Sequence, residues 1–205
     1  MTDKYLENLK YLESGNLKKA GPYFAKHGYE LESAYCKLLE DNLKGAKQIF
    51  LKLRDSDLRA DFGYRLVSIL QSKIPDDPVP AEKLPKFFQL RNFLETDMNL
   101  LIKYNKGEYI EKICSYSDIL AGINSETYKY FSRVFFFNDF TEFAIHFAMK
   151  AKNYFYNDAE LHYHLALIMM KQNNKELAIN YCNSCLRIAD NYYPAKHLLE
   201  TLTGN

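Results

Sequence analysis

Apolar residues recur along this chain at intervals of three and four, which is the spacing of side chains on one face of an α-helix. The interval is clearest at Tyr128, Phe131 and Phe135, and it resumes at Ala144 and Ala148 after a short polar break. Large side chains occupy the first stretch and small ones the second, so two helix axes can approach closely. The pattern predicts a pair of antiparallel helices joined by a tight turn.

The same hairpin pattern occurs twice in succession without a gap. Residues 125–158 and 159–192 are both 34 residues long and have large, small and polar residues at matching positions. Such self-similarity is the signature of a helical repeat. The matched pairs are Phe131 with Leu165, Ser132 with Ala166, Phe135 with Met169, Ala144 with Ala178, Ala148 with Cys182 and Ala151 with Cys185.

Turn-forming residues extend the repeat upstream. We take Gly15, Gly45, Gly107, Asp139 and Asn173 as turn markers, with spacings of 30, 62, 32 and 34. Because 62 is twice 31, a further unit with a remodelled turn is expected in the second interval. That interval contains a Pro-rich segment that no helix can cross. We interpret the segment as a long loop between helices, with a break between two sub-stacks as the alternative.

The two ends of the chain are also predicted to be helical. Residues Asp3 to Glu13 carry an apolar stripe at Tyr5, Leu9 and Leu12. At the other end, a helix is expected to open at Tyr193 and to run to about Leu202. It would act as the terminal cap that a stack of repeats needs.

Composition narrows the classes of function. The 205 residues carry 27 Lys and Arg against 26 Asp and Glu, a net charge of +1, and 17 Tyr and 14 Phe without a Trp. Nucleic acids and anionic membranes need a basic face, so neither is expected as a partner. A charged N-terminal stretch indicates no secretory signal, and four cysteines do not suggest a disulfide framework. A cytoplasmic location is predicted.

No catalytic signature is present in the sequence: GxSxG, GxxxxGK[ST], HExxH and GxGxxG are all missing. We therefore predict a non-enzyme without cofactor, metal or catalytic residues. Cys182 and Cys185 form a CxxC, but they fall in mid-helix at positions where small apolar side chains pack, so packing is favoured over a redox or metal role. His162 and His164 are two residues apart and should point to different faces, the first to the core and the second to the concave side.

The 34-residue hairpin resembles the tetratricopeptide repeat (TPR), most clearly over residues 125–192. Tyr156 and Asp190 depart from the family's usual Pro, and His162 stands where the family prefers Trp. The resemblance implies an all-α fold, a right-handed superhelical solenoid of about six helix-turn-helix units.

Three regions follow from this resemblance. Residues 1–74 would hold degenerate TPR-like repeats, residues 75–85 the Pro-rich loop or linker, and residues 86–205 the C-terminal repeats with a capping helix.

The family lines its concave groove with the first helix of each repeat, and the resemblance carries the groove positions onto twelve residues here. They are aromatic and Met-rich with a few charges, which suits a peptide or helix of a partner. A clamp for a chaperone's C-terminal carboxylate is not expected, because Arg133 and His164 replace its asparagines. The twelve groove residues are Glu126, Lys129, Tyr130, Arg133, Phe136, Phe137, Glu160, Tyr163, His164, Leu167, Met170 and Lys171.

The function expected from the sequence is a non-catalytic protein–protein interaction module. The first alternative is a regulatory or substrate-recruiting subunit of an enzyme or secretion complex, with a chaperone-like role. Exposed aromatic residues could also pair two copies of the chain as a homodimer.

Overall fold

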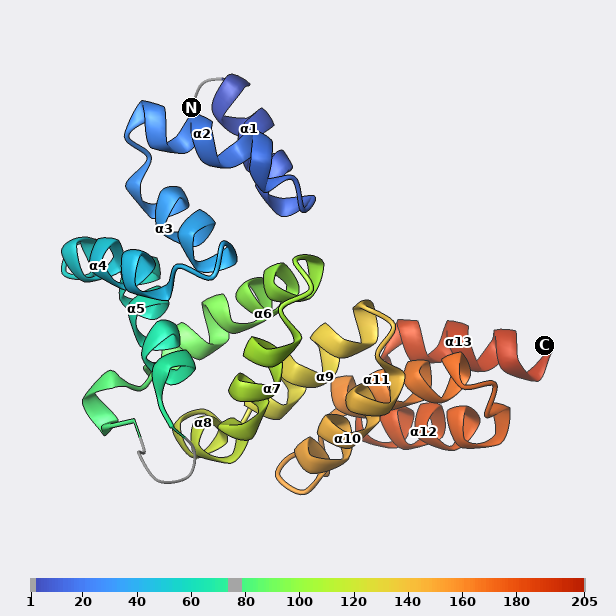
Figure 1. Ribbon diagram of the computed structural model, residues 1–205. Coiled ribbons are helices and arrows are strands. Elements are labelled where there is room, and N and C mark those ends of the chain that lie inside the picture. The colour runs from blue at the N-terminus through green and yellow to red at the C-terminus, as the bar shows by residue number, and fades with distance from the viewer. Residues whose placement is uncertain (1–2, 74–78, 205) are drawn as a thin grey trace. The chain divides into compact units, whose positions relative to one another are not determined.

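The computed structural model describes residues 3–73 and 79–204, and the described chain is entirely helical (Figure 1). It contains thirteen α-helices, one short 3-10 helix and no strand in these residues, which confirms the all-α prediction. The helices in chain order are α1 (Asp3–Glu13), α2 (Leu17–His27), α3 (Glu30–Leu39), α4 (Leu43–Leu53), α5 (Leu58–Gln71), η1 (Ala81–Lys83), α6 (Phe87–Lys103), α7 (Gly107–Ser115), α8 (Ser117–Ile123), α9 (Thr127–Phe137), α10 (Thr141–Lys152), α11 (Ala159–Lys171), α12 (Lys175–Ile188) and α13 (Tyr193–Thr203).

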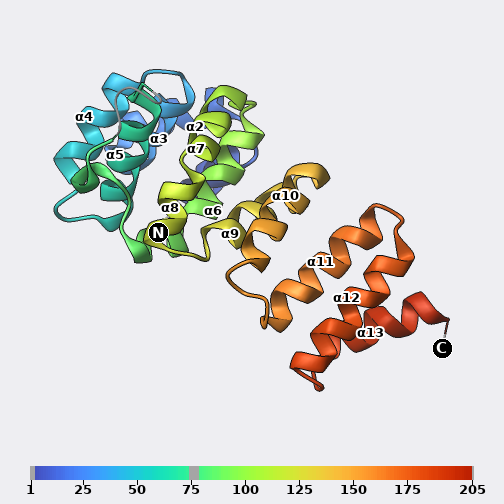
Figure 2. The ribbon, with the colours of Figure 1, turned by 90° about the horizontal axis from the view of Figure 1, so that it is seen from below.

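The chain forms two compact units, Met1–Asn124 and Ser125–Asn205. The first contains α1 to α8 and the second α9 to α13. The first unit has residues on both sides of the expected Pro-rich loop, 75–85. Residues 75–78 of that loop lie outside the described residues, and the remainder holds the 3-10 turn η1. In the second unit α11, α12 and α13 lie side by side (Figure 2).

Six turns between consecutive helices share one backbone geometry. In each, one residue has a positive φ, between 54° and 88°, and the N–H of the next residue donates to the carbonyl five residues before it, at 2.8 to 3.1 Å. This is the Schellman arrangement, which satisfies carbonyls left open at a helix end. The residues with positive φ in these six turns are Gly15, Gly28, Asp41, Asn105, Asp139 and Asn173.

Two of the expected turn markers are wrong. Gly45 lies in the first turn of α4 and Gly107 opens α7, whereas the residues with positive φ are Asp41 and Asn105. Asp and Asn can adopt this conformation because their short polar side chains bond locally. Gly45 serves another purpose: its N–H donates to the Asn42 side chain at 2.9 Å, and a Cβ there would lie 2.8 Å from that side chain.

The turn at Asn173 gives a stability prediction. Asn173 is exposed with φ of 59°, a conformation that glycine adopts without a steric penalty. We expect Asn173→Gly to raise the free energy of unfolding by about 0.5 kcal/mol, and Asn173→Ala to lower it by about 1 kcal/mol. Urea denaturation followed by circular dichroism measures both. Asn180→Gly, at an exposed position inside α12, is the matched control and should be destabilising. Loss of stability with glycine at both positions would contradict the turn argument.

The core of the second unit packs large aromatic rings against alanines. The ring of Phe147 on α10 stacks on that of Phe135 on α9 at 5.7 Å and lies 4.8 Å from that of Phe131. Ala144 and Ala148 on α10 are completely buried. The predicted pairing of large and small side chains within the hairpin is therefore confirmed.

Polar side chains in the first unit tie the segment before α6 to α5. Asp61 accepts hydrogen bonds from Arg65 at 3.0 Å and from Gln89 at 2.8 Å. Arg65 also donates to the carbonyls of Glu82 and Leu84, at 2.6 and 2.7 Å. Burial alone would raise the pKa of Asp61, but the bonds from Arg65 and Gln89 outweigh it and hold the pKa below its usual value. The network anchors the segment around η1 to α5.

A second buried polar group joins three helices of the first unit. Asp97 of α6 accepts a hydrogen bond from the Tyr35 hydroxyl of α3 at 2.9 Å and pairs with Arg59 of α5. The Arg59 guanidinium lies over the rings of Tyr35 and Phe93, at 4.9 and 5.5 Å from their centroids. Burial raises the pKa of Asp97 to about 6, although Arg59 and Tyr35 act to lower it.

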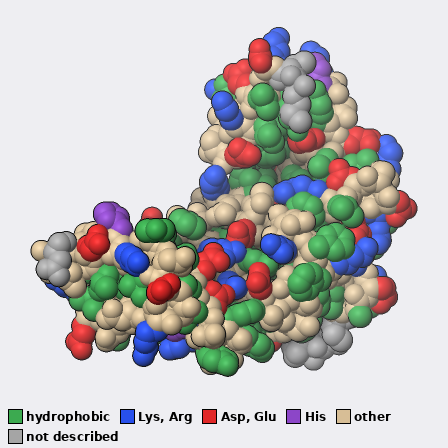
Figure 3. Space-filling model, turned by 180° about the vertical axis from the view of Figure 1, so that it is seen from behind, with side chains coloured by type: hydrophobic (Ala, Val, Ile, Leu, Met, Phe, Trp, Pro, Cys, Tyr) green, Lys and Arg blue, Asp and Glu red, His purple; other side chains and the backbone are tan. Residues whose placement is uncertain are grey.

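Acidic and basic side chains are interspersed over the face drawn in Figure 3. Among the helices of residues 3–73 and 79–204, none combines the length and apolar character needed to cross a bilayer.

Candidate functional site

A pocket of about 170 Å³ opens between α9 and α11 in the second unit. Side chains four residues apart on α9 form one wall, and an apolar stripe of α11 forms the other. Tyr192, directly before α13, contributes to the lining. The lining residues are Lys129, Arg133, Phe137, Glu160, Leu161, Tyr163, His164, Leu167 and Tyr192.

Seven of the twelve predicted groove residues line this pocket together: Lys129, Arg133, Phe137, Glu160, Tyr163, His164 and Leu167. The structure places the other five outside the lining. Among these five, Tyr130 is buried, with 3% of its surface exposed, whereas Met170, at the end of α11, is 40% exposed. The five are Glu126, Tyr130, Phe136, Met170 and Lys171.

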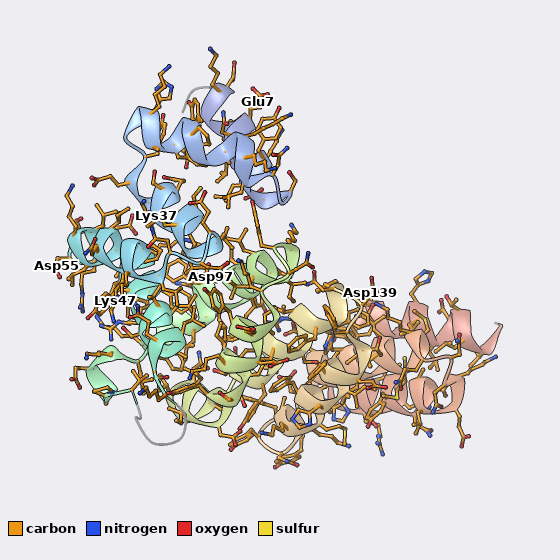
Figure 4. The ribbon with its side chains drawn as sticks, in the orientation of Figure 1. Glu7, Lys37, Lys47, Asp55, Asp97 and Asp139 are labelled. Atoms are coloured by element: carbon orange, nitrogen blue, oxygen red, sulfur yellow. The ribbon has the colours of Figure 1, made fainter. Side chains whose placement is uncertain are left out.

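Phe136 and Lys171 lie together near the turn between α9 and α10. The Lys171 ammonium lies 5.0 Å from the centroid of the Phe136 ring and donates to the Phe136 carbonyl at 3.1 Å. It also pairs with Asp139 at that turn (Figure 4). These contacts join the end of α11 to the α9–α10 turn.

The Lys129 ammonium is paired with carboxylates of its own unit. Lys129 is 7% exposed, and its ammonium donates to Asp158 at 2.8 Å and to Glu126 at 3.4 Å. Asp158 in turn caps α11 by accepting from the Leu161 N–H at 3.1 Å. Burial would raise the pKa of Asp158, but the hydrogen bonds from Lys129 and Leu161 hold it below its usual value. Lys129 therefore fixes α9 to α11 at this side of the pocket.

Arg133 and Glu160 provide the opposite charges of the pocket. Their side chains approach to 3.7 Å, and the Arg133 guanidinium lies 5.3 Å from the centroid of the Tyr130 ring. The Glu160 side chain is 62% exposed, so water screens this pair. A ligand with a polar group could compete for either partner.

His164 forms an uncharged part of the wall. Its Nε2 lies 2.9 Å from the Ser132 hydroxyl, and that hydroxyl donates its hydrogen to the Ala144 carbonyl at 2.7 Å. The proton between His164 and Ser132 must therefore belong to the imidazole Nε2. Burial, followed by the nearby charge of Arg133, lowers the pKa of His164 to about 4. The side chain is neutral at physiological pH.

The two histidines of α11 point to different surroundings, as the sequence predicted. His162 is 6% exposed, and its Nε2 lies 2.9 Å from the Tyr156 carbonyl. His164 lines the pocket. In the described parts of the chain, no three His, Cys, Asp or Glu side chains are grouped so that they could hold a metal ion.

The cysteines of the CxxC lie in the packed interior of the second unit, where their repeat positions predict them. Cys182 and Cys185 on α12 are both completely buried, and Cys182 contacts Ala166 and Leu198. Burial raises the pKa of Cys182 and brings that of Cys185 to about 11. Burial and a raised pKa both lower the reactivity expected of a thiol.

Two features of the lining escape sequence analysis. Tyr192 faces Tyr163 with ring centroids 5.5 Å apart, and Leu161 completes the wall on α11. Tyr192 is the last residue of the second repeat, and that position next to the following helix was the one available signal. The first unit also contains a larger hollow, of about 590 Å³, lined in part by the stripe Tyr5, Leu9 and Leu12.

Comparison of the sequence with protein-family models and with curated proteins finds no match. Function is therefore inferred from the residues and geometry of this chain.

Proposed function

We propose that the protein is a non-catalytic interaction module, and that its second unit binds a segment of a partner protein in the pocket between α9 and α11. The observation that carries this proposal is the convergence of seven predicted groove residues on one pocket. The segment is a peptide or a helix that presents its side chains to the pocket.

The chemistry of the lining supports a peptide ligand. Tyr163, Tyr192 and Leu167 offer apolar surface, and Arg133 with Glu160 offers both charges. Phe137 is 74% exposed, so it is available to contact a partner. A volume of about 170 Å³ fits one or two side chains rather than a whole helix. The pocket would thus hold an anchoring residue while the rest of the segment lies along α9 and α11.

We also propose that the fold is a TPR-like, right-handed solenoid of about six units in a cytoplasmic protein. Three of the shared turns support the family's repeat length, because Asn105, Asp139 and Asn173 are 34 residues apart. Neither nucleic acid nor membrane is proposed as a partner, in keeping with the interspersed charges of Figure 3. As an alternative, the chain is a regulatory or substrate-recruiting subunit of an enzyme or secretion complex, with a chaperone-like role.

A photo-crosslinking experiment tests the pocket. Benzoylphenylalanine replaces Leu167 in the full chain, which is then irradiated in extracts of the source cell, and the crosslinked products are identified by mass spectrometry. We expect a defined partner segment whose yield falls at least tenfold when Tyr163→Ala and Tyr192→Ala are combined. Tyr156→Ala is the matched control, since Tyr156 is 76% exposed and outside the lining.

The products also separate the alternatives. A catalytic chain among them favours the subunit role, and crosslinks to a second copy of this chain favour a homodimer. A yield unchanged by the double substitution would contradict the pocket assignment. Tyr130→Ala is avoided because the buried Tyr130 ring contributes to folding.

A further inference from the structure

The first unit contains a hollow that is larger than the pocket proposed above. It has a volume of about 590 Å³, against about 170 Å³ between α9 and α11. Its lining comes from α1, α3 and α6, with Arg59 from the start of α5. A space of this size accommodates several side chains of a ligand at once.

Leucine side chains from three helices form the apolar part of the lining. Leu9 and Leu12 of α1 face the hollow together with Leu31 of α3 and Leu100 of α6. The apolar stripe of α1 that predicts a helix therefore lines an open space along part of its length. An apolar surface left open on a folded chain is a common mark of a binding site.

One part of the lining, called the floor here, is polar and consists of Arg59 and Tyr35, whose side chains both contact the buried Asp97. Asp97 is 2% exposed and lies between α3, α5 and α6 (Figure 4). The charges of Arg59 and Asp97 offset each other. The floor consequently adds no net charge to the hollow.

The remaining charges of the lining are mainly negative. Each of the three helices contributes one glutamate, namely Glu13 on α1, Glu32 on α3 and Glu95 on α6. Lys103 supplies a single positive charge against these three. With the Arg59–Asp97 pair counted as neutral, the side chains that line the hollow sum to a formal charge of −2. A negative potential in a concave site attracts positive ligands and repels phosphates.

Contacts at one side of the hollow hold its walls in place. The Tyr104 hydroxyl at the end of α6 donates to the Leu12 carbonyl of α1 at 2.8 Å. The Tyr5 hydroxyl of α1 donates to Glu32 of α3 at 2.7 Å. Because these bonds join α1 to both α3 and α6, the hollow exists before a ligand arrives, and binding need not order its walls.

We propose that this hollow is a second binding site, and that it takes a polypeptide segment of another protein with apolar side chains and at least two lysines or arginines. The leucines receive the apolar side chains, and the negative charge of the lining attracts the basic ones. The net negative charge of the lining favours such a segment over nucleic acid or anionic lipid.

Selection from a random 16-residue peptide library on phage tests this proposal with the full chain as target. Enriched peptides are synthesised and their affinities measured by fluorescence anisotropy. We expect a basic and apolar consensus, with affinity about tenfold weaker for Glu13→Gln/Glu32→Gln/Glu95→Gln at low salt. The control Glu40→Gln/Glu108→Gln/Glu111→Gln removes the same number of charges from exposed positions outside the lining and should change affinity less than twofold.

The outcomes separate this site from the pocket of the second unit. Affinity retained in Tyr163→Ala/Tyr192→Ala, with circular dichroism unchanged in every variant, supports the hollow as the site. The proposal is overturned if no peptide is enriched, if the consensus is acidic or uncharged, or if the triple variant binds as tightly as its control. Peptide binding that is lost only in Tyr163→Ala/Tyr192→Ala would also overturn the proposal, and it would support the pocket between α9 and α11.

Discussion

Replacing Arg59 by Met is expected to lower the free energy of unfolding of the first unit by about 3–5 kcal/mol at pH 7. The substitution leaves the Asp97 carboxylate, 2% exposed, without its cation in the space between α3, α5 and α6. A single hydrogen bond from Tyr35 remains. Hydrogen exchange of peptides from these three helices, measured in the full chain, reports the loss.

Two comparisons distinguish this effect from general damage. Arg91→Met removes an exposed arginine from α6 and should change stability by less than about 0.5 kcal/mol. The double substitution Arg59→Met/Asp97→Leu removes both charges and should recover much of the lost stability. Equal losses in the single and double variants would show that packing, rather than the unpaired carboxylate, determines the result.

The Asp97 carboxylate also makes the stability of the first unit depend on pH. Burial raises the folded pKa of Asp97 to about 6, above the value of 3.8 expected when unfolded. A raised acid pKa contributes stability that is complete below the unfolded pKa and is lost as pH rises through the folded one. Without Arg59 the folded pKa rises further, so Asp97 is protonated at pH 5. The deficit of Arg59→Met should therefore be smaller at pH 5 than at pH 7.

Phe131→Ala should lower the free energy of unfolding of the second unit by about 3–5 kcal/mol. The Phe131 ring is completely buried and lies 4.8 Å from that of Phe147, so its removal leaves a cavity between α9 and α10. Phe137→Ala, on the same helix but 74% exposed, is the control and should cost less than about 0.5 kcal/mol. Hydrogen exchange of α9 to α12 measures both, and similar losses would contradict the assigned core.

The periodic features of this fold could be predicted from the sequence. A helix was predicted over Asp3 to Glu13, and α1 has these bounds. A last helix was predicted to begin at Tyr193, and α13 begins there. The face shared by Arg133 and Phe137 follows from a spacing of four. The turn residues were harder to predict from the sequence. A nearby glycine is the usual sign of a positive φ, but here Asp41 and Asn105 adopt that conformation instead.

Features that depend on distant partners could not be predicted. Lys129 was expected to face a ligand, yet it is paired with Asp158, 29 residues away. The hollow of the first unit also escaped notice, because a stripe such as Tyr5 to Leu12 shows that a helix has an apolar side and not whether that side is filled. One wall of this hollow is held by the hydrogen bond from Tyr104 to Leu12, which are 92 residues apart in the sequence.

The buried cysteines make each unit report on its own opening. Cys36 is enclosed in the first unit, and Cys182 and Cys185 in the second. A thiol reagent can reach them only when the surrounding helices separate, so the rate of alkylation measures how often each unit opens in the native state. The two units can therefore be compared without any substitution when alkylation is followed site by site, which separates the partly buried Cys114 from the enclosed thiols.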